Sequence, residues 1–363
     1  MRPNSGGLRR TAVNHLRRKG MANPERVRRL ISETIRELEL DLRDLVVFTE
    51  AATGHYAVTP VIAAMAGAEV YALARDSRHG KTETAKSHCR KLAQYCGVWE
   101  QVTVVTRKDP RQLGRAHIVT NLGMVRPIDE STVDMMGPQA VVPYMCEAWE
   151  VRPGDVDFKA CAARGIPVMG TDEDAPGLRV FDYVGPLSQR MLMELEIEVH
   201  KSRIAVVGND KFGRRIVAHL SKAGALAFVL PHLRGRIHRS SLKDCDGLVI
   251  ADYSSEEVII GQYGQITAEE IARSAPGISV VPLCGEVDVH SLADEGIPHY
   301  PSTGSGKHRM GLTFAALGPR PIIELHAAGL KVGEAMARAR LLGLSRKQTR
   351  SFALQHSPAQ LIK

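Results

Sequence analysis

The sequence predicts an α/β protein of two doubly wound parallel-sheet domains, with a cleft between them and C-terminal helices that cross back to the first domain. Its 363 residues exceed the roughly 150 of one ordinary domain. The pattern strand, glycine-bearing turn, helix, strand also occurs twice, from Leu45 and again from Arg203. Short apolar runs that alternate with helical segments in this way are typical of a parallel sheet covered on both faces.

The first pass opens with a short buried strand at 45–48, a small-residue helix at 58–68 and a strand at 69–75. A polar helix follows at about 82–96. Four further apolar runs predict strands at 101–106, 116–122, 140–145 and 166–170.

The second pass begins with a strand that ends at Gly208 and a helix that starts near Gly213. Three more segments are expected as strands, at 247–253, 278–283 and 298–301, with a helix at 267–275 between the first two. Residues 313–343 then predict long amphipathic helices.

These patterns predict four regions after a basic tail at 1–23 that we expect to be disordered. They are a substrate domain at 24–185, a second segment of that domain at 318–345, a dinucleotide-binding-like domain at 186–317, and a C-terminal tail at 346–363. The first domain should open with a helix whose N-cap is Asn23 and whose first residue is Pro24.

Composition narrows the functional class. No apolar run approaches the roughly 18 residues of a membrane span, and the basic N-terminus is not followed by an apolar segment, so we expect a cytoplasmic protein. The six cysteines are scattered without C-x-x-C spacing, which predicts buried thiols and no metal site. Six of the charges behind the net +8 lie in residues 1–20, leaving +2 for the remainder, and aromatic residues are only 5%, so a nucleic-acid partner is not expected.

The stretch 206–213, VVGNDKFG, follows the dinucleotide-binding pattern G-x-G-x-x-G of Rossmann-like domains except at its second glycine. Gly208 would supply the tight turn and Gly213 the close helix packing. Asp210 replaces the glycine that lets backbone approach a pyrophosphate, and its charge would repel phosphates unless it turns away to cap the helix. Two interpretations stay open: a working nicotinamide site, or a structural unit with another ligand or none.

The acidic residue that binds ribose in NAD-dependent enzymes is missing about 20 residues further on. In the region where that acidic residue is expected, the chain has three arginines instead, at Arg234, Arg236 and Arg239. If a dinucleotide binds, they favour the 2′-phosphate of NADP, although NAD stays open.

The stretch 155–171, DVDFKACAARGIPVMGT, resembles the phrase that closes the substrate domain of the D-isomer-specific 2-hydroxyacid dehydrogenase family, the formate and glycerate dehydrogenase-like superfamily. The resemblance covers roughly residues 115–310, and S-adenosylhomocysteine hydrolase is more distantly similar. It implies two Rossmann-like domains, NAD or NADP, a small-molecule substrate and a homodimer.

The family's catalytic residues are only partly matched. Cys284 stands where the family has an arginine that clamps the substrate carboxylate, and a neutral thiol does not replace it. The family's histidine follows a proline, whereas this chain has Ser302 after Pro301 and places His308 six residues later.

The expected site residues therefore come from both domains. His308 would exchange a proton, and Lys307 or Arg309 would hold substrate. Glu50 and His55 lie in a strand-to-helix turn at 49–56. The expected cofactor-binding residues are Gly208, Asp210, Phe212, Gly213, Arg234, Asp252 and Cys284.

Three functions remain open. The first is an NAD(P)-dependent oxidoreductase that acts on a small polar metabolite. The second is a non-redox enzyme, such as a lyase or cyclase, that retains a nicotinamide cofactor as S-adenosylhomocysteine hydrolase does. The third is a ligand-binding protein that has lost catalysis. Cofactor retained after purification would favour the second, and turnover of added cofactor the first.

Overall fold

The computed structural model describes residues 23–77, 80–208 and 210–362. They form two compact units. Unit 1 comprises the described residues up to Val180 together with those from Gly318 onward, and unit 2 comprises Phe181–Leu317. The predicted tail lies outside the described residues except for Asn23. As predicted, helix α2 (Pro24–Glu37) begins at Pro24, and the Asn23 side chain accepts the backbone N–H of Arg26 at 3.0 Å.

Unit 1 contains a parallel sheet in which strands adjacent in space are not all adjacent in sequence. Four strands lie in the order β3-β2-β1-β4, and a parallel bridge between Ile118 and Val141 continues the sheet into β5 and β6. The resulting order 3-2-1-4-5-6 is that of the Rossmann fold, whose ligand crevice lies where the order reverses, between β1 and β4. The strands are β1 (Val46–Glu50), β2 (Glu69–Leu73), β3 (Val102–Val105), β4 (Ile118–Val119), β5 (Val142–Tyr144) and β6 (Val168–Thr171).

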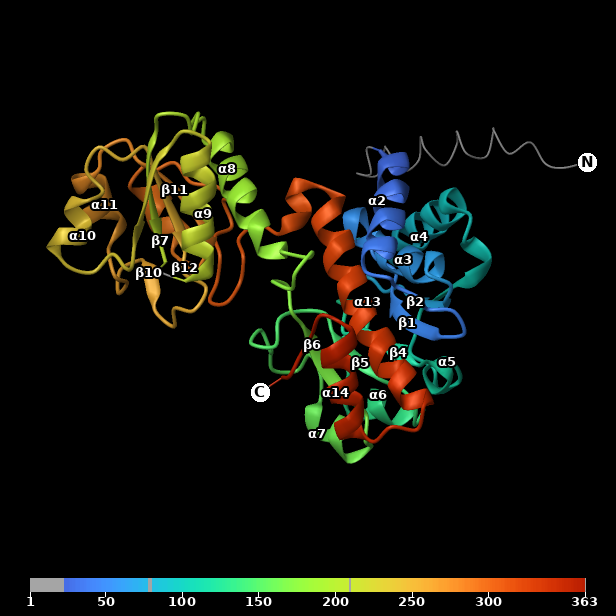
Figure 1. Cartoon of the computed structure of the whole chain (residues 1–363). Helices are drawn as coiled ribbons and strands as arrows, with labels where there is room; N and C mark the ends of the chain where they lie inside the picture. Colours follow the sequence, from blue (N-terminus) through green and yellow to red (C-terminus); the bar gives the residue numbers. More distant parts are fainter. Residues whose placement is uncertain (1–22, 78–79, 209, 363) are drawn as a thin grey trace, which may run out of the picture. The chain divides into compact units, whose positions relative to one another are not determined.

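Helices cover both faces of the unit 1 sheet (Figure 1). One face packs on α5, α6 and α7 through a buried cluster that includes Phe48, Val119 and Tyr144. The other face packs on α3 and α13, where Ile118 of β4 lies against Gly333 of α13. The helices are α3 (Thr59–Met65), α4 (Thr82–Cys96), α5 (Pro110–Arg115), α6 (Glu130–Met135), α7 (Phe158–Ala163), α13 (Pro319–Leu341) and the short η1 (Gly54–Val58) and η2 (Trp99–Gln101).

Unit 2 contains a second parallel sheet, in the order β11-β9-β7-β8. Because β8 and β9 lie on opposite sides of β7, the order reverses between β7 and β9. The strands are β7 (Arg203–Val207), β8 (Leu226–Leu230), β9 (Gly247–Ala251) and β11 (Ser279–Cys284), with a separate small pair of β10 (Val258–Ile260) and β12 (Glu286–Val287). The strand expected at 298–301 is reduced to one bridge between His299 and Val280.

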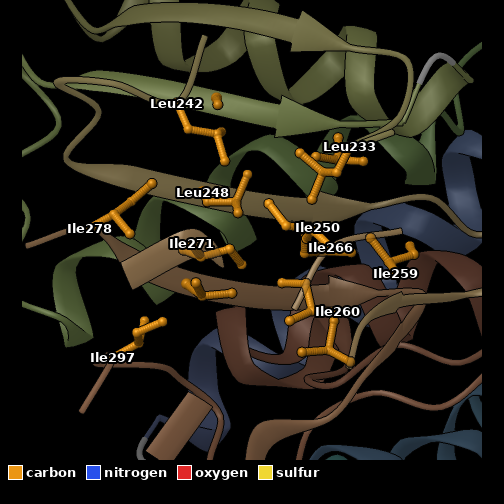
Figure 2. Close-up of a cluster of buried hydrophobic side chains, with 14 of the residues drawn as sticks. Leu233, Leu242, Leu248, Ile250, Ile259, Ile260, Ile266, Ile271, Ile278 and Ile297 are labelled. Atoms are coloured by element: carbon orange, nitrogen blue, oxygen red, sulfur yellow. The ribbon is translucent and has the colours of Figure 1, made fainter. Parts of the chain in front are cut away.

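Two groups of helices cover unit 2. Helices α8 and α9 pack together on one face of the sheet. The other face rests on a core of branched aliphatic side chains that includes Leu233, Leu248, Ile250 and Ile271 (Figure 2). The helices are η3 (Val180–Tyr183), α8 (Val184–Glu194), α9 (Lys211–Lys222), α10 (Arg236–Ser240), α11 (Ala268–Ser274), α12 (Val289–Asp294) and η4 (Phe314–Leu317).

The C-terminal segment is folded where the sequence predicts a tail. Helix α14 (Arg346–His356) packs on α13, and strand β13 (Ala359–Gln360) pairs antiparallel with β6. Within the described residues, no helix has the length and apolar character needed to cross a membrane. All six cysteines are free thiols, five of them buried and Cys146 half-buried.

Candidate functional site

The turn between β7 and α9 has the two glycines that a dinucleotide turn requires. Gly208 has a φ of +127°, and a Cβ there would meet the carbonyl oxygen of Ala251 at 2.5 Å. A Cβ on Gly213 would overlap the carbonyl oxygen of Gly208. Both positions therefore exclude other side chains, because backbone cannot give way as a flexible side chain can.

Asp210 is the N-cap of α9, and its side chain occupies the amides that bind phosphate in a dinucleotide turn. Its Oδ1 accepts the backbone N–H of Phe212 at 2.9 Å and of Gly213 at 3.2 Å. Burial raises the pKa of Asp210, and the negative charge of Asp252 raises it further. The N-terminus of α9 thus already holds an anion supplied by the chain itself.

Phe212 is buried, with 2% of its surface exposed. Its ring stacks on Tyr253 with centroids 5.6 Å apart and planes 6° apart, and meets Phe181 edge-on at 5.1 Å. This stack lies just beyond the carboxyl ends of β7 and β9, where the order of the sheet reverses. Phe212 contributes to the core of unit 2 and offers little surface to a ligand.

Asp252 and Cys284 lie at the ends of the neighbouring strands β9 and β11. Asp252 Oδ1 accepts hydrogen bonds from the Ser254 hydroxyl and the Ser255 N–H, each at 3.1 Å, and so closes a tight turn. Cys284 is fully buried, and burial together with the charges of Asp210 and Asp252 holds its pKa well above the usual range. A thiol in this setting is neither accessible nor reactive.

His308 is held by acceptors on both of its ring nitrogens. Nδ1 lies 2.9 Å from the carbonyl oxygen of Tyr253, and Nε2 lies 2.9 Å from Oε1 of Glu256. Because both partners only accept, both hydrogen bonds form together only when the ring carries two protons. Its φ of +51° is left-handed, a constraint often found at functional positions.

A cavity of about 520 Å³ opens in unit 2 beside the ends of β8 and β9. It brings together Arg234 and Lys307 with Glu256, the partner of His308. Its full lining is Arg234, Gly235, Arg239, Glu256, Glu257, Val258, Tyr263, Gly264, Gln265 and Lys307. A volume of this size is in the range of small-molecule sites.

The walls of the cavity are fixed by ion pairs and hydrogen bonds. Arg234 pairs with Glu257, and Lys307 Nζ lies 3.8 Å from Glu286. Arg239 pairs with Glu270 and donates to the carbonyl oxygen of Gln265 at 3.0 Å. The ring of Tyr263 is 90% exposed. The side chain of Arg236, the third arginine of the predicted 2′-phosphate set, lies outside the described part of the chain.

The other two predicted catalytic residues, Glu50 and His55, belong to unit 1. Glu50 ends β1 and accepts the Met124 N–H at 3.0 Å, and burial raises its pKa. His55 is half-buried in η1, and burial lowers its pKa. Its Nδ1 is buried and makes no hydrogen bond to any described residue.

Sequence reasoning missed Glu256 and Tyr263. Glu256 follows β9 in the run SSEE, and charged residues beyond the carboxyl end of a parallel strand are a recognised signal of a ligand site. Tyr263 gave no such signal, since it lies in a loop between two short apolar segments.

No protein-family model and no curated protein sequence matches the chain. Solved structures do match over most of its length. A dipicolinate synthase chain from Bacillus halodurans is 12% identical, with a TM-score of 0.52, and the match covers 79% of this chain and 96% of that one. The corresponding dipicolinate synthase chain from Bacillus subtilis is also 12% identical, with a TM-score of 0.51 and coverages of 84% and 99%.

The chain shares the two-unit Rossmann-like fold of these proteins. A D-lactate dehydrogenase from Treponema pallidum also matches, at 12% identity, a TM-score of 0.46 and coverages of 83% and 98%. The predicted fold class is confirmed by the two parallel sheets and by the fold shared with the dipicolinate synthase chains. Solved structures of 2-hydroxyacid dehydrogenases are also among the matches, as the predicted resemblance implies. The roles of the site residues remain predictions.

Proposed function

We propose that this protein binds a small polar metabolite in the cavity of unit 2 and does not act there as an ordinary nicotinamide-dependent dehydrogenase. The observation that carries the proposal is the position of the Asp210 carboxylate on the amides of Phe212 and Gly213. In a dinucleotide site those amides receive the pyrophosphate.

A dinucleotide would have to displace this carboxylate before its phosphates reach α9. Losing the cap costs about 1 kcal/mol. The displaced charge would stay close to both phosphates and to Asp252, which already raises the pKa of Asp210. Two further features agree with a unit that has lost hydride transfer. Cys284 is a buried thiol in place of the family's arginine, and both ring nitrogens of His308 are engaged.

The cavity has the chemistry of a site for a polar, partly anionic molecule. Three cations line it, Arg234, Arg239 and Lys307, and the side chains of Arg234 and Lys307 are about half exposed. Glu256 and Glu257 offset part of this positive charge, and their carboxylates accept hydrogen bonds. A ligand that also carries hydroxyl or amino groups could therefore donate to them. The exposed ring of Tyr263 would cover an apolar face of the ligand.

An NAD(P)-dependent oxidoreductase acting on a small polar metabolite is the second candidate. The geometry of Gly208 and Gly213 favours it, because both glycines of the turn are sterically required. Arg234, beyond the end of β8, would then meet the 2′-phosphate of NADP. An enzyme that retains its nicotinamide would be purified with the absorbance of the cofactor.

The test is calorimetric titration of the full chain with hydroxy acids, amino acids, sugar phosphates, nucleotides and the four nicotinamide dinucleotides. We expect a metabolite to bind the wild type and to bind Arg234→Gln and Lys307→Gln about tenfold or more weakly, since each variant removes a charged hydrogen-bond donor. Arg273→Gln, on α11 outside the cavity lining, is the matched control and should bind as the wild type does. Dinucleotide binding to the wild type would establish the second candidate instead.

A further inference from the structure

The last part of the chain carries positive charge without compensation. Residues 335–363 contain six Lys and Arg residues and no Asp or Glu. Three of the six, Arg346, Lys347 and Arg350, fall in the first five residues of α14. Cations at the start of a helix face the positive end of its dipole, so this arrangement is unfavourable by itself.

Arg346 and Arg350 are one helical turn apart and share one side of α14. Burial lowers the pKa of Arg350, and the charge of Arg346 lowers it further. The Nε atoms of both side chains are inaccessible and make no hydrogen bond to a described residue. Neither guanidinium forms an ion pair or a hydrogen bond within the described part of the chain.

The neighbouring arginines of α13 differ in their terminal nitrogens, which donate hydrogen bonds, although the Nε of Arg340 is likewise buried without a partner among the described residues. Arg338 donates to the carbonyl oxygens of Asp41 and Arg43, at 3.3 and 2.6 Å. Arg340 donates to the carbonyl oxygens of Pro138 and Leu344, at 2.8 and 3.4 Å. The hydrogen bonds of Arg338 and Arg340 connect α13 to other segments of unit 1, whereas Arg346 and Arg350 make no such connection within the described residues.

We propose that Arg346 and Arg350 bind a doubly charged oxyanion, the phosphate group of a small phosphate monoester or inorganic phosphate. Two guanidinium groups on one side of a helix supply paired N–H donors that suit the oxygens of a phosphate. A dianion would offset the repulsion between the two side chains and the unfavourable dipole interaction. This site belongs to unit 1 and is separate from the cavity of unit 2.

The test follows the arginine Nε–Hε signals of the full chain by NMR while inorganic phosphate is added at constant ionic strength. We expect the signals of Arg346 and Arg350 to shift together and to saturate. Arg346→Gln and Arg350→Gln should weaken binding about tenfold or more, because each removes a charge-assisted donor. Lys347→Gln removes the same charge from the same helix and should bind within about twofold of the wild type.

Two further arms sharpen the result. Titration with glycerol phosphate identifies the source, since tighter binding than inorganic phosphate means a phosphorylated metabolite and weaker binding means the free ion. In phosphate-free buffer Arg350→Gln should melt no lower than the wild type, and phosphate should reverse that order. Shifts that never saturate, or that are equal in Arg346→Gln and Lys347→Gln, would overturn the proposal.

Discussion

The backbone nitrogen of Phe212 donates to the carboxylate of Asp210 at 2.9 Å, in the first turn of α9. The fold around this contact keeps the glycines of a dinucleotide turn, while the contact itself uses the donors that such a turn reserves for phosphate. On the proposed function, this single side chain decides whether the scaffold of unit 2 is open to a dinucleotide.

Replacing Asp210 separates its charge from its role as a cap. Asp210→Gly removes the charge and the side-chain hydrogen bonds of the cap. We expect it to change the free energy of unfolding by less than about 1 kcal/mol, because glycine is well tolerated at N-cap positions. Asp210→Asn keeps the cap and removes the charge. Urea unfolding followed by far-UV circular dichroism measures both. A loss of several kcal/mol in Asp210→Gly would mean that the carboxylate has a structural role beyond the cap.

The raised pKa of Asp210 gives its contribution to stability a definite sign. The folded state holds the proton more tightly than the unfolded state, whose carboxyl titrates near 3.8. The contribution is therefore fully present below pH 3.8 and is lost as the pH rises through the folded pKa. The stability of the wild type relative to Asp210→Asn should fall over this window in urea unfolding at a series of pH values. A relative stability that increases with pH would contradict the assignment.

Gly213→Ala should disrupt the β7–α9 turn. The added methyl would overlap the carbonyl oxygen of Gly208, and overpacking of this kind costs about 1–3 kcal/mol. Gly306→Ala is the matched control in the same unit, because nothing lies within 4 Å of its Cβ position. The control should stay within about 0.5 kcal/mol of the wild type in urea unfolding. Equal stability of the two variants would show that the turn is not packed as described.

Unit 1 should be sensitive to acid through His326. This side chain is fully buried on α13, its Nδ1 lies 2.6 Å from the Thr59 hydroxyl, and burial lowers its pKa to about 4. The unfolded chain takes up the proton below the ordinary value of 6.5, so stability is lost as the pH falls from 6.5 to 4, by about 3 kcal/mol in all. Both tryptophans, Trp99 and Trp149, lie in unit 1, so fluorescence reports its unfolding. His326→Asn should be less stable at pH 7 and lose correspondingly less on acidification. An unchanged acid dependence would exclude His326 as the cause.

The sequence predicts most strands of both sheets because each is a short, continuous apolar run. The fold buries strands in the middle of the sheets, such as β1 and β9, along their whole length. The sequence misses β10, β12 and β13, which are two or three residues long and carry no period of their own. It also misses α14, whose buried residues are only Thr349 and Ala353, although the capping box of Ser345 and Gln348 is a readable start signal.

The site is less predictable than the fold because its contacts join distant residues. From the sequence, Asp210 can be interpreted either as a helix cap or as a barrier to phosphate. Its hydrogen bond to the Phe212 N–H is compatible with both roles, because a cap that occupies this amide also keeps phosphate away from it. His308 and Glu256 are 52 residues apart. They meet because the loop of His308 returns to the end of β11, where Met310 bridges Cys284, and β11 lies beside β9, after which Glu256 follows. The cavity depends likewise on Arg234 and Lys307, which no local pattern connects.

The most direct test of the account is calorimetric titration of the wild type and Asp210→Gly with NADH and NADPH. We predict no saturable binding to the wild type up to about 1 mM and clear binding to Asp210→Gly, because the glycine frees the amides of Phe212 and Gly213 for the pyrophosphate. Saturable binding to the wild type, as tight as to the variant, would contradict the claim that Asp210 closes the dinucleotide site.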